Sequence, residues 1–368
     1  MRILLLWTFY DDYLTAFYAA RAGLAGQAHA EQLRQLLDDG FGWPPAVGRR
    51  LAELGHEVEI VVANAEPLQR AWAREAGAEF PDSGWQVRLP VEQVRRFRPD
   101  VLWIGSNFRY FGPWLRSVRE YCGSVVAWTA APLPTGLDLA GIDCILTSHE
   151  NFVREFRSRG VRCERVLPCF ETAILGAPGD RPRDLPVSFV GSLSWAHMER
   201  IRAMNRVAKE TPLEIWTAAP KVLSRSALRP AFWRARWAAR DLIPRSHSEV
   251  FGRAMYEVML RSRLAVNVHI GVAGGLAGNM RMFEATGCGA LLLTEQAPNL
   301  AELFAPGEEV VSYDGTDDLI AKIRHYLGQP GEAAEIAAAG QRRTLTEYTA
   351  EVRARELESV FLGLSRVA

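Results

Sequence analysis

The chain has 368 residues, which exceeds the length that one hydrophobic core usually supports and therefore predicts two domains. Its 43 Lys and Arg residues balance 43 Asp and Glu residues, which excludes a protein that attracts nucleic acid or anionic membrane through net charge. A hydrophobic content of 48% is typical of a soluble globular protein with sizeable cores.

The cysteines and the amino-terminal segment bear on the compartment. Five cysteines form no CxxC pair, which indicates reduced, mostly buried thiols and neither a disulfide framework nor a zinc site. The segment MRILLLWTFYDD is too short and becomes acidic too soon for a signal peptide. No apolar run approaches the ~20 residues of a membrane span. We therefore expect a cytoplasmic protein.

Apolar runs bounded by polar residues recur along the first half and predict buried parallel strands. These runs are 2–8, 56–63, 101–105, 124–129 and 142–147. Helical segments are expected between them, among them 67–77, 91–97 and 150–159. The alternation of strands and helices predicts a doubly wound α/β domain. The aromatic-rich segment 9–42, which carries Asp11, Asp12 and His29, is the least regular part.

The segment 177–186 (APGDRPRDLP) breaks this pattern with proline, glycine and charges, and it is the best candidate for an interdomain linker. A second α/β series follows it. We expect domains at 1–176 and 187–343, and a charged amphipathic helix at the end of the chain, 344–368. The ligand cleft is then expected between the domains, at the carboxyl ends of the strands.

A strand, a glycine-bearing loop, a short helix and a second strand follow one another in 264–294. The loop is Gly271–Asn279, and it leads into the helix Met280–Thr286. The start of a helix presents free N–H groups and favours anions, so this unit indicates a phosphate-bearing ligand. The alternative is that the glycines only turn the chain.

An arginine-rich segment interrupts the second series at 225–245, where Trp233 and Trp237 share a helical face. Such a segment is compatible with contact to a membrane surface or to an acidic acceptor. The more common arrangement is a solvated helix whose aromatic side chains pack inward, and we favour it.

Several motifs resemble those of the GT-B glycosyltransferases, which have two facing Rossmann-like domains with a central cleft, and most closely the branch similar to the spore-maturation protein CgeB. The most specific motifs are FVGSLSWAHMER (189–200) and NMRMFEATG (279–287), and GALLL, LFAPGEEVVSY and GQRRTL follow them. In the first domain the matching segments are LGHEVEIVVAN and LQRAWAREAG. The resemblance covers nearly the whole chain and is loose only in its first forty residues.

The resemblance implies that the second domain binds the nucleotide of an activated sugar. It also implies that the helix at 344–368 returns to the first domain. Glu284 occupies the position that accepts hydrogen bonds from the ribose hydroxyls, a task for which a carboxylate is suited; otherwise it is a charge on a helix surface. Gly274, Gly275 and Asn279 are expected to bring backbone and amide donors to the diphosphate. Arg281 either pairs with a phosphate oxygen or braces the helix.

Five further positions belong to the expected donor site. Gly191 and Ser192 follow a strand, in the loop beside the leaving diphosphate, and Arg200 is a candidate phosphate clamp. His197 either touches phosphate or caps its helix. His269 points toward the ligand if its strand is assigned correctly, although a histidine after a buried strand is more often a satisfied core residue.

One position departs from the family pattern. Retaining members carry a second glutamate eight positions before the ribose-binding one, and here that position is Leu276. The resemblance therefore does not imply either inversion or retention. An inverting enzyme needs a general base for the acceptor hydroxyl, and Asp11, Asp12 and His29 are the candidates.

Asn107 and Arg109 end another predicted strand and are candidates to bind either substrate. No Asp-x-Asp motif and no His/Cys cluster has the spacing of metal ligands. We therefore expect no metal: the helix dipole, backbone amides and arginines stabilise the leaving diphosphate.

The leading hypothesis is a glycosyltransferase that uses a UDP-, GDP- or dTDP-linked sugar as co-substrate. The acceptor is a small molecule, a glycan or a protein, and not a nucleic acid. A nucleotide-sugar epimerase or hydrolase of the same fold and a non-catalytic nucleotide-binding protein are the alternatives. The sequence names neither the sugar, the base, the acceptor nor the oligomeric state.

Overall fold

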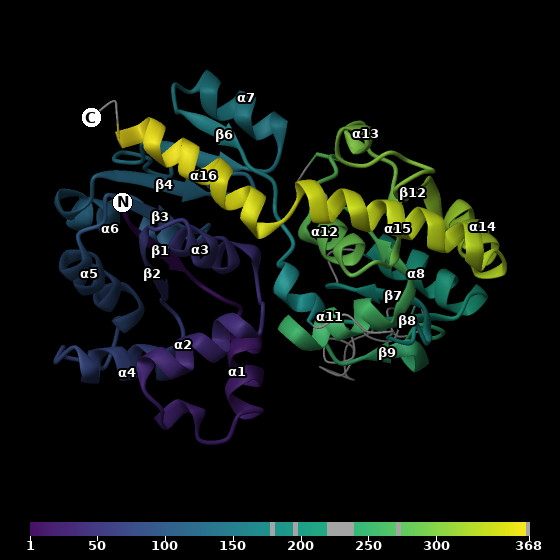
Figure 1. Ribbon diagram of the computed structural model, residues 1–368, viewed down its shortest axis with the longest axis horizontal. Helices are drawn as coiled ribbons and strands as arrows, with labels where there is room; N and C mark the ends of the chain where they lie inside the picture. Colours follow the sequence, from purple (N-terminus) through teal and green to yellow (C-terminus); the bar gives the residue numbers. More distant parts are fainter. Residues whose placement is uncertain (177–180, 194–197, 219–238, 270–273, 366–368) are drawn as a thin grey trace. The chain divides into compact units, whose positions relative to one another are not determined.

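The computed structural model describes residues 1–176, 181–193, 198–218, 239–269 and 274–365. The chain divides into two compact units (Figure 1). The first comprises Met1–Glu171 and Ala350–Ala368, and the second comprises Thr172–Thr349.

The first unit is built on a parallel six-stranded sheet with the order β2-β1-β3-β4-β5-β6. Its strands are β1 (Arg2–Trp7), β2 (Glu57–Val62), β3 (Val101–Ile104), β4 (Ser124–Trp128), β5 (Cys144–Thr147) and β6 (Cys163–Arg165). All residues of β3, β4 and β5 are buried, as expected of strands covered on both faces.

The helices of the first unit lie in the connections between these strands, except for the last, which is at the end of the chain. They are α1 (Asp11–Ala19), α2 (His29–Asp38), α3 (Trp43–Glu53), α4 (Glu66–Glu75), α5 (Trp85–Phe97), α6 (Pro113–Val118), α7 (Glu150–Ser158) and α16 (Ala350–Ser365). The aromatic-rich segment that looked irregular in the sequence therefore contains two helices.

Helix α5 begins six residues before the expected position and continues through Pro90. A proline has no N–H, so Pro90 leaves the carbonyl of Gln86 without its helical partner. The hydroxyl of Tyr110 donates to that carbonyl at 2.9 Å, and the indole N–H of Trp114 donates to the carbonyl of Val87 at 3.0 Å. These tertiary bonds compensate for the proline.

Helix α16 packs on α3 in the first unit (Figure 1). Its Phe361 is fully buried and meets the Trp103 ring of β3 with centroids 6.0 Å apart. In α3, Gly48 permits close approach to the sheet, because a Cβ there would lie 3.1 Å from Ile60 of β2. The core on this face therefore includes residues from both ends of the sequence.

The second unit contains another parallel six-stranded sheet, with the order β12-β11-β10-β7-β8-β9. Its strands are β7 (Leu185–Val190), β8 (Leu213–Trp216), β9 (Ser246–His247), β10 (Ser262–Asn267), β11 (Leu291–Glu295) and β12 (Val311–Tyr313). Strand β7 begins inside the expected linker. The two sheets confirm the predicted α/β class.

The described helices of the second unit follow the same alternation. They are α8 (Met198–Glu210), α11 (Gly252–Arg261), α12 (Met280–Gly287), α13 (Leu300–Leu303), α14 (Gly315–Gly328) and α15 (Pro330–Glu347). The apolar core includes side chains from β7, β10, β11, α8 and α14.

The end of the chain differs from the expected single helix starting at Thr344, because this residue lies inside α15. Two hydrogen bonds accompany the break between α15 and α16. The Tyr348 hydroxyl donates to the carbonyl of Leu303 at 2.7 Å, and the amide of Ala350 donates to the carbonyl of Phe170 at 3.0 Å. These contacts depend on distant segments and leave little trace in the local pattern.

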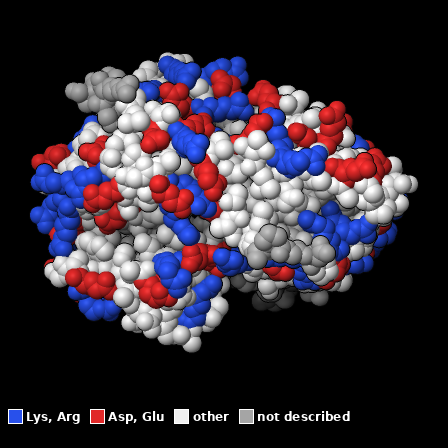
Figure 2. All heavy atoms as spheres, viewed as in Figure 1, with Lys and Arg blue, Asp and Glu red and all other residues white. Residues whose placement is uncertain are grey.

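Basic and acidic side chains are interspersed on the face shown in Figure 2. This distribution agrees with the equal numbers of the two kinds of charge. Among the described residues, no helix is both long and apolar enough to cross a membrane. The arginine-rich segment lies for the most part outside the described residues, at 225–238, and so do Trp233 and Trp237.

Candidate functional site

The strand order of the second sheet reverses between β7 and β10. From β7 the chain proceeds to β8 and β9 on one side, and it then returns to place β10, β11 and β12 on the other. Ligands of doubly wound sheets bind at the carboxyl ends of the strands at such a reversal. The residues after β7 and β10 are therefore the first place to look for a site.

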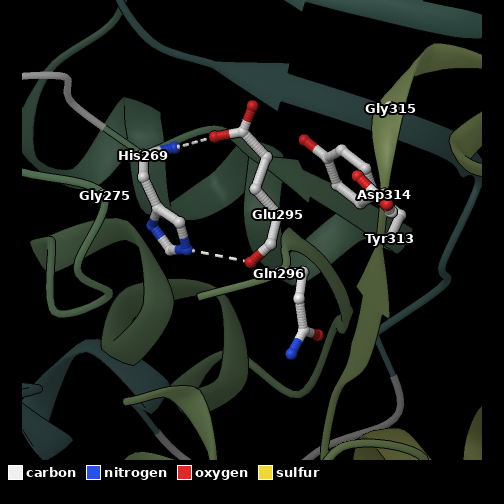
Figure 3. Close-up of a pocket in the computed structure, with 7 residues that line it drawn as sticks. All are labelled: His269, Gly275, Glu295, Gln296, Tyr313, Asp314 and Gly315. Atoms are coloured by element: carbon white, nitrogen blue, oxygen red, sulfur yellow. Dashed lines mark hydrogen bonds between the residues drawn. The ribbon is translucent and has the colours of Figure 1, made fainter. Parts of the chain in front are cut away.

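A pocket of about 320 Å³ lies at the carboxyl ends of β10, β11 and β12, and we call it the β10–β12 pocket (Figure 3). It is lined by His269, Gly275, Glu295, Gln296, Tyr313, Asp314 and Gly315. Of these, only His269 and Gly275 were expected from the sequence. The others occupy the ends of β11 and β12, whose positions beside β10 depend on the tertiary fold.

His269 is 8% exposed and is held by Glu295 at two points (Figure 3). Its main-chain N–H donates to the Glu295 carboxylate at 2.6 Å, and its Nε2 lies 3.0 Å from the Glu295 carbonyl oxygen. Because a carbonyl oxygen only accepts, Nε2 carries the proton. Burial lowers the pKa of His269 below 6.5, with Glu295 opposing part of the shift, so the ring is neutral near pH 7.

A buried polar network joins the ends of these strands to the start of α12. The Tyr313 hydroxyl donates to the Asn267 carbonyl at 2.8 Å, and burial raises the pKa of Tyr313 well above 10.0. The side-chain amides of Asn267 and Asn279 exchange hydrogen bonds of 3.1 and 2.7 Å. Asn279 directly precedes α12. Its amide is therefore engaged within the protein, and its expected contact with a diphosphate stays a prediction.

The glycine loop reaches α12 through backbone conformations that favour glycine. Gly274 and Gly275 have φ angles of 65° and 79°. Asn299 holds the end of the loop, because its side chain accepts from the amide of Ala277 at 2.8 Å and donates to its carbonyl at 3.0 Å. Residues 270–273 of the loop lie outside the described residues.

Arg200 connects the two sides of the strand-order reversal between β7 and β10. It lies in α8, which follows β7, and its guanidinium donates to the main-chain carbonyl of His269 at 2.8 Å. Gly191 directly follows β7, and its amide donates to the Trp216 carbonyl at 3.1 Å, while Ser192 is exposed. Arg200 is thereby brought beside the β10–β12 pocket. His197 lies outside the described residues.

Arg281 and Glu284 form a buried ion pair on α12. Arg281 donates to the Glu284 carboxylate at 2.7 Å, and the Tyr256 hydroxyl of α11 lies 3.5 Å from the other oxygen. The Glu284 side chain is 4% exposed and that of Arg281 is 20% exposed. Arg281 also contacts Met255 of α11, and neither member of the ion pair lines the β10–β12 pocket. Their expected contacts with ribose and phosphate stay predictions.

Asp11 and Asp12 form the first turn of α1, just after β1, and both are exposed. Asn64 orients this turn: its amide group donates to Asp11 at 2.9 Å and to the Phe9 carbonyl at 2.7 Å, and its oxygen accepts from the Phe9 amide at 2.9 Å. Asn64 follows β2 and was not singled out in the sequence. The only signal for Asn64 in the sequence is its position after an apolar run.

His29 begins α2 and has different neighbours. Its main-chain N–H donates to Glu75 of α4 at 2.8 Å, and burial lowers the pKa of its ring below 6.5. Among the described residues, His29 therefore contacts α4, whereas Asp11 contacts Asn64. The structure does not group the three candidate bases into one hydrogen-bonded set.

Asn107 lies after β3, close to the end of β1. Its amide nitrogen is 3.5 Å from the Thr8 hydroxyl, and its oxygen accepts from the amide of Arg109 at 3.3 Å. The Arg109 side chain bonds to Gln86 of α5 instead. The carboxyl ends of β1, β2 and β3 therefore carry Asp11, Asn64 and Asn107. Within the described ranges, no group of three or more metal-binding side chains occurs.

Comparison with known proteins identifies the fold. Residues 196–359 match the sequence model of the family described as glycosyl transferase-like. HepE of Anabaena, solved with UDP-glucose, is 12% identical with a TM-score of 0.63, over 99% of this chain and 100% of that one. The chain has the GT-B glycosyltransferase fold.

Two further solved structures agree with this assignment. Sucrose-phosphate synthase of Thermosynechococcus elongatus is 13% identical with a TM-score of 0.62, and all of each chain is covered. AviGT4, a glycosyltransferase of avilamycin A biosynthesis, is 15% identical with a TM-score of 0.60, over 100% of this chain and 98% of that one. No curated protein sequence matches the chain.

Proposed function

We propose that the protein is a glycosyltransferase that moves a sugar from a nucleoside diphosphate sugar to an acceptor. The GT-B fold and the glycosyl transferase-like match over residues 196–359 support the reaction class. A fold neighbour solved with UDP-glucose supports a nucleotide sugar as donor. The motifs FVGSLSWAHMER and NMRMFEATG favour the CgeB-like branch within this class.

The observation that carries the proposal is the position of Arg200. Its guanidinium lies at the reversal in the strand order, bonded to the carbonyl of His269, two residues after the end of β10 and just before the glycine loop. A diphosphate at this point meets a positive charge and the N-terminal end of α12. Both stabilise the negative charge that develops on the leaving diphosphate, so we propose that transfer needs no divalent ion.

On the acceptor side we propose Asp11 as the general base. Transfer requires the acceptor oxygen to bond to the anomeric carbon while the bond from that carbon to the diphosphate breaks. The proton of the acceptor hydroxyl then passes to a carboxylate. Asp11 is favoured over Asp12 because Asn64 fixes its orientation. His29 is the alternative base, since its lowered pKa leaves the ring neutral and able to accept a proton.

The test is a melting-temperature screen of the full chain. A ligand that binds only the folded state stabilises it by about 2.7 kcal/mol at a concentration one hundred times its Kd. We expect one of UDP, GDP and dTDP, together with its sugars, to raise the melting temperature. No shift with any of them would overturn the proposal. A second experiment incubates the protein with the nucleotide sugar and no acceptor. If the sugar is converted to an isomer, the protein is an epimerase and not a transferase.

A further inference from the structure

Tyr10 is an exposed aromatic residue directly before Asp11, the proposed general base. It is 69% exposed, and the next largest value for a bulky apolar residue in the described part of the chain is 40%, at Leu362. Its place in the sheet is also distinctive. The order of the first sheet reverses between β1 and β3, and Tyr10 follows β1 at that reversal. Since ligands of α/β sheets bind at such a place, the exposed ring is available to a ligand.

The ring of Tyr10 is supported by a second segment of the chain. Its centroid lies 5.5 Å from that of Phe41, and the two ring planes meet at 70°, so the Phe41 ring does not lie flat against Tyr10. Phe41 stacks in turn on Tyr13, with centroids 4.0 Å and planes 18° apart. Tyr13 is buried, and its hydroxyl donates to Asp39 at 3.1 Å. A ring that is already restrained loses little side-chain entropy when a ligand binds.

The main chain on both sides of Tyr10 is fixed as well. Before it, the Asn64 side chain accepts from the amide of Phe9 at 2.9 Å and donates to its carbonyl at 2.7 Å. After it, the amide of Leu14 donates to the Tyr10 carbonyl at 3.0 Å in the first turn of α1. Asn64 also donates to the Asp11 carboxylate at 2.9 Å. One side chain therefore orients the candidate base and the segment that carries the exposed ring.

An exposed ring beside carboxylates matches the chemistry of a sugar. One face of a pyranose consists of C–H groups, which pack on the electron-rich face of an aromatic ring. The hydroxyls of a pyranose lie around its edge and donate to carboxylates. Asp11 and Asp12 are exposed carboxylates in the same turn as Tyr10. An aromatic acceptor would also use the ring, but its apolar edge would take water from these charges at a cost in free energy.

We propose that Tyr10 selects the acceptor and that the acceptor is a sugar unit whose C–H face lies against the Tyr10 ring. This inference rests on the proposed function and narrows the acceptor to a carbohydrate. A hydroxyl of the acceptor sugar bonds to the anomeric carbon of the donor while the bond from that carbon to the diphosphate breaks, and the hydroxyl proton passes to Asp11. Tyr10 takes no part in the proton transfer and acts as a positioning residue.

Transfer by the full chain tests the proposal, measured as nucleoside diphosphate released above the rate without acceptor. The donor is the nucleotide sugar that the melting-temperature screen selects. The acceptor probes are the methyl glycosides of glucose, galactose, mannose, N-acetylglucosamine and rhamnose, with phenol and umbelliferone as aromatic alcohols. At least one methyl glycoside should be glycosylated, and at a higher kcat/KM than either aromatic alcohol.

Substitutions of Tyr10 then separate stacking from other roles. Tyr10→Ala and Tyr10→Leu should raise the KM for the accepted glycoside about tenfold and change kcat by less than about threefold, because stacking binds the acceptor equally before and during transfer. Tyr10→Phe keeps the ring and should keep the KM of the wild type. Leu54→Ala is the control, since Leu54 is an apolar residue of the same unit with 39% exposure, and it should leave the KM unchanged.

Calorimetry with the nucleoside diphosphate shows whether each variant is folded, because the Tyr10 variants should bind it as the wild type does. The proposal is wrong if no methyl glycoside is glycosylated, if an aromatic alcohol is the better acceptor, or if Tyr10→Ala leaves the KM for the glycoside unchanged. Each of these results leaves binding of the nucleotide sugar intact. If no nucleotide raises the melting temperature of the wild type, the proposed function itself fails.

Discussion

The guanidinium of Arg200 donates a hydrogen bond of 2.8 Å to the main-chain carbonyl of His269. Arg200 follows β7 and His269 follows β10, so this bond joins the two sides of the strand-order reversal in the second sheet. A phosphate group beside Arg200 would be adjacent to the β10–β12 pocket.

Replacement of Arg200 by Gln should weaken binding of the nucleoside diphosphate by about tenfold or more, because one charged partner of the phosphate is lost. Calorimetry with the nucleotide chosen by the melting-temperature screen measures the effect. Arg206→Gln is the matched control: it lies on the same helix, is exposed, and pairs with Glu210 and Asp317. Equal effects of the two substitutions would contradict a phosphate role for Arg200.

Glu284 can be tested separately from its ion pair with Arg281. If the Glu284 carboxylate accepts the ribose hydroxyls, the wild type should bind UDP more tightly than 2′,3′-dideoxy-UDP. If the melting-temperature screen selects GDP or dTDP, the corresponding dideoxy analogue is used. Glu284→Gln should abolish this preference, a change of about tenfold in the affinity ratio. A purely structural role for the buried ion pair would lower both affinities and leave their ratio intact.

Glu59 of β2 gives a prediction about pH. Burial raises the pKa of this carboxyl from 4.5 to about 7 in the folded chain. The folded state therefore binds the proton more tightly than the unfolded state, and the free energy of unfolding falls as the pH rises from 4.5 through 7. Glu59→Gln should stabilise the protein by about 1–3 kcal/mol at pH 8 and have little effect at pH 5.

Thermal denaturation followed by circular dichroism at the two pH values measures the effect of Glu59→Gln. Glu79→Gln replaces an exposed glutamate of the same unit and should change the melting temperature little at either pH. A Glu59 variant that is equally stabilised at both pH values would contradict the raised pKa.

Phe361 should be a major contributor to the stability of the first unit. Truncation to Ala removes a fully buried ring from its contact with Trp103 and should cost about 3–5 kcal/mol. Leu362→Ala, at the neighbouring position with 40% exposure, should change stability by no more than about 0.5 kcal/mol. Hydrogen exchange should show lost protection in β3 and unchanged protection in β10; loss in both would show that the two units unfold together.

The sequence predicted the long apolar strands of both sheets and their parallel arrangement, because buried strands are continuous apolar runs. Strands β6, β9 and β12 were not predicted as strands. Their sequences, CER, SH and VSY, are short and partly polar, and pairing with a neighbour defines them. The start of α5 was also missed, because Pro90 is a local stop signal that Tyr110 and Trp114 offset from elsewhere in the chain.

For the site, resemblance and strand position selected Arg200, His269 and the glycine loop. They did not select Glu295, Tyr313, Asn64 or Asn299. Each of these residues acts on a partner more than twenty residues away, so its role depends on which strands become neighbours. The one available signal was general: Thr294-Glu295 and Tyr313-Asp314 are polar residues just after apolar runs, at the sheet edge where parallel α/β folds bind ligands.

The position of α16 has a consequence for the order of folding during synthesis. The second unit is contiguous, Thr172–Thr349, and it can complete its core as soon as that stretch has left the ribosome. The first unit is made earlier, yet the part of its core that α16 supplies, including the contact of Phe361 with Trp103, can form only after residue 361 has been added. During synthesis the first unit therefore lacks the apolar side chains of α16 while the second unit can already complete its core.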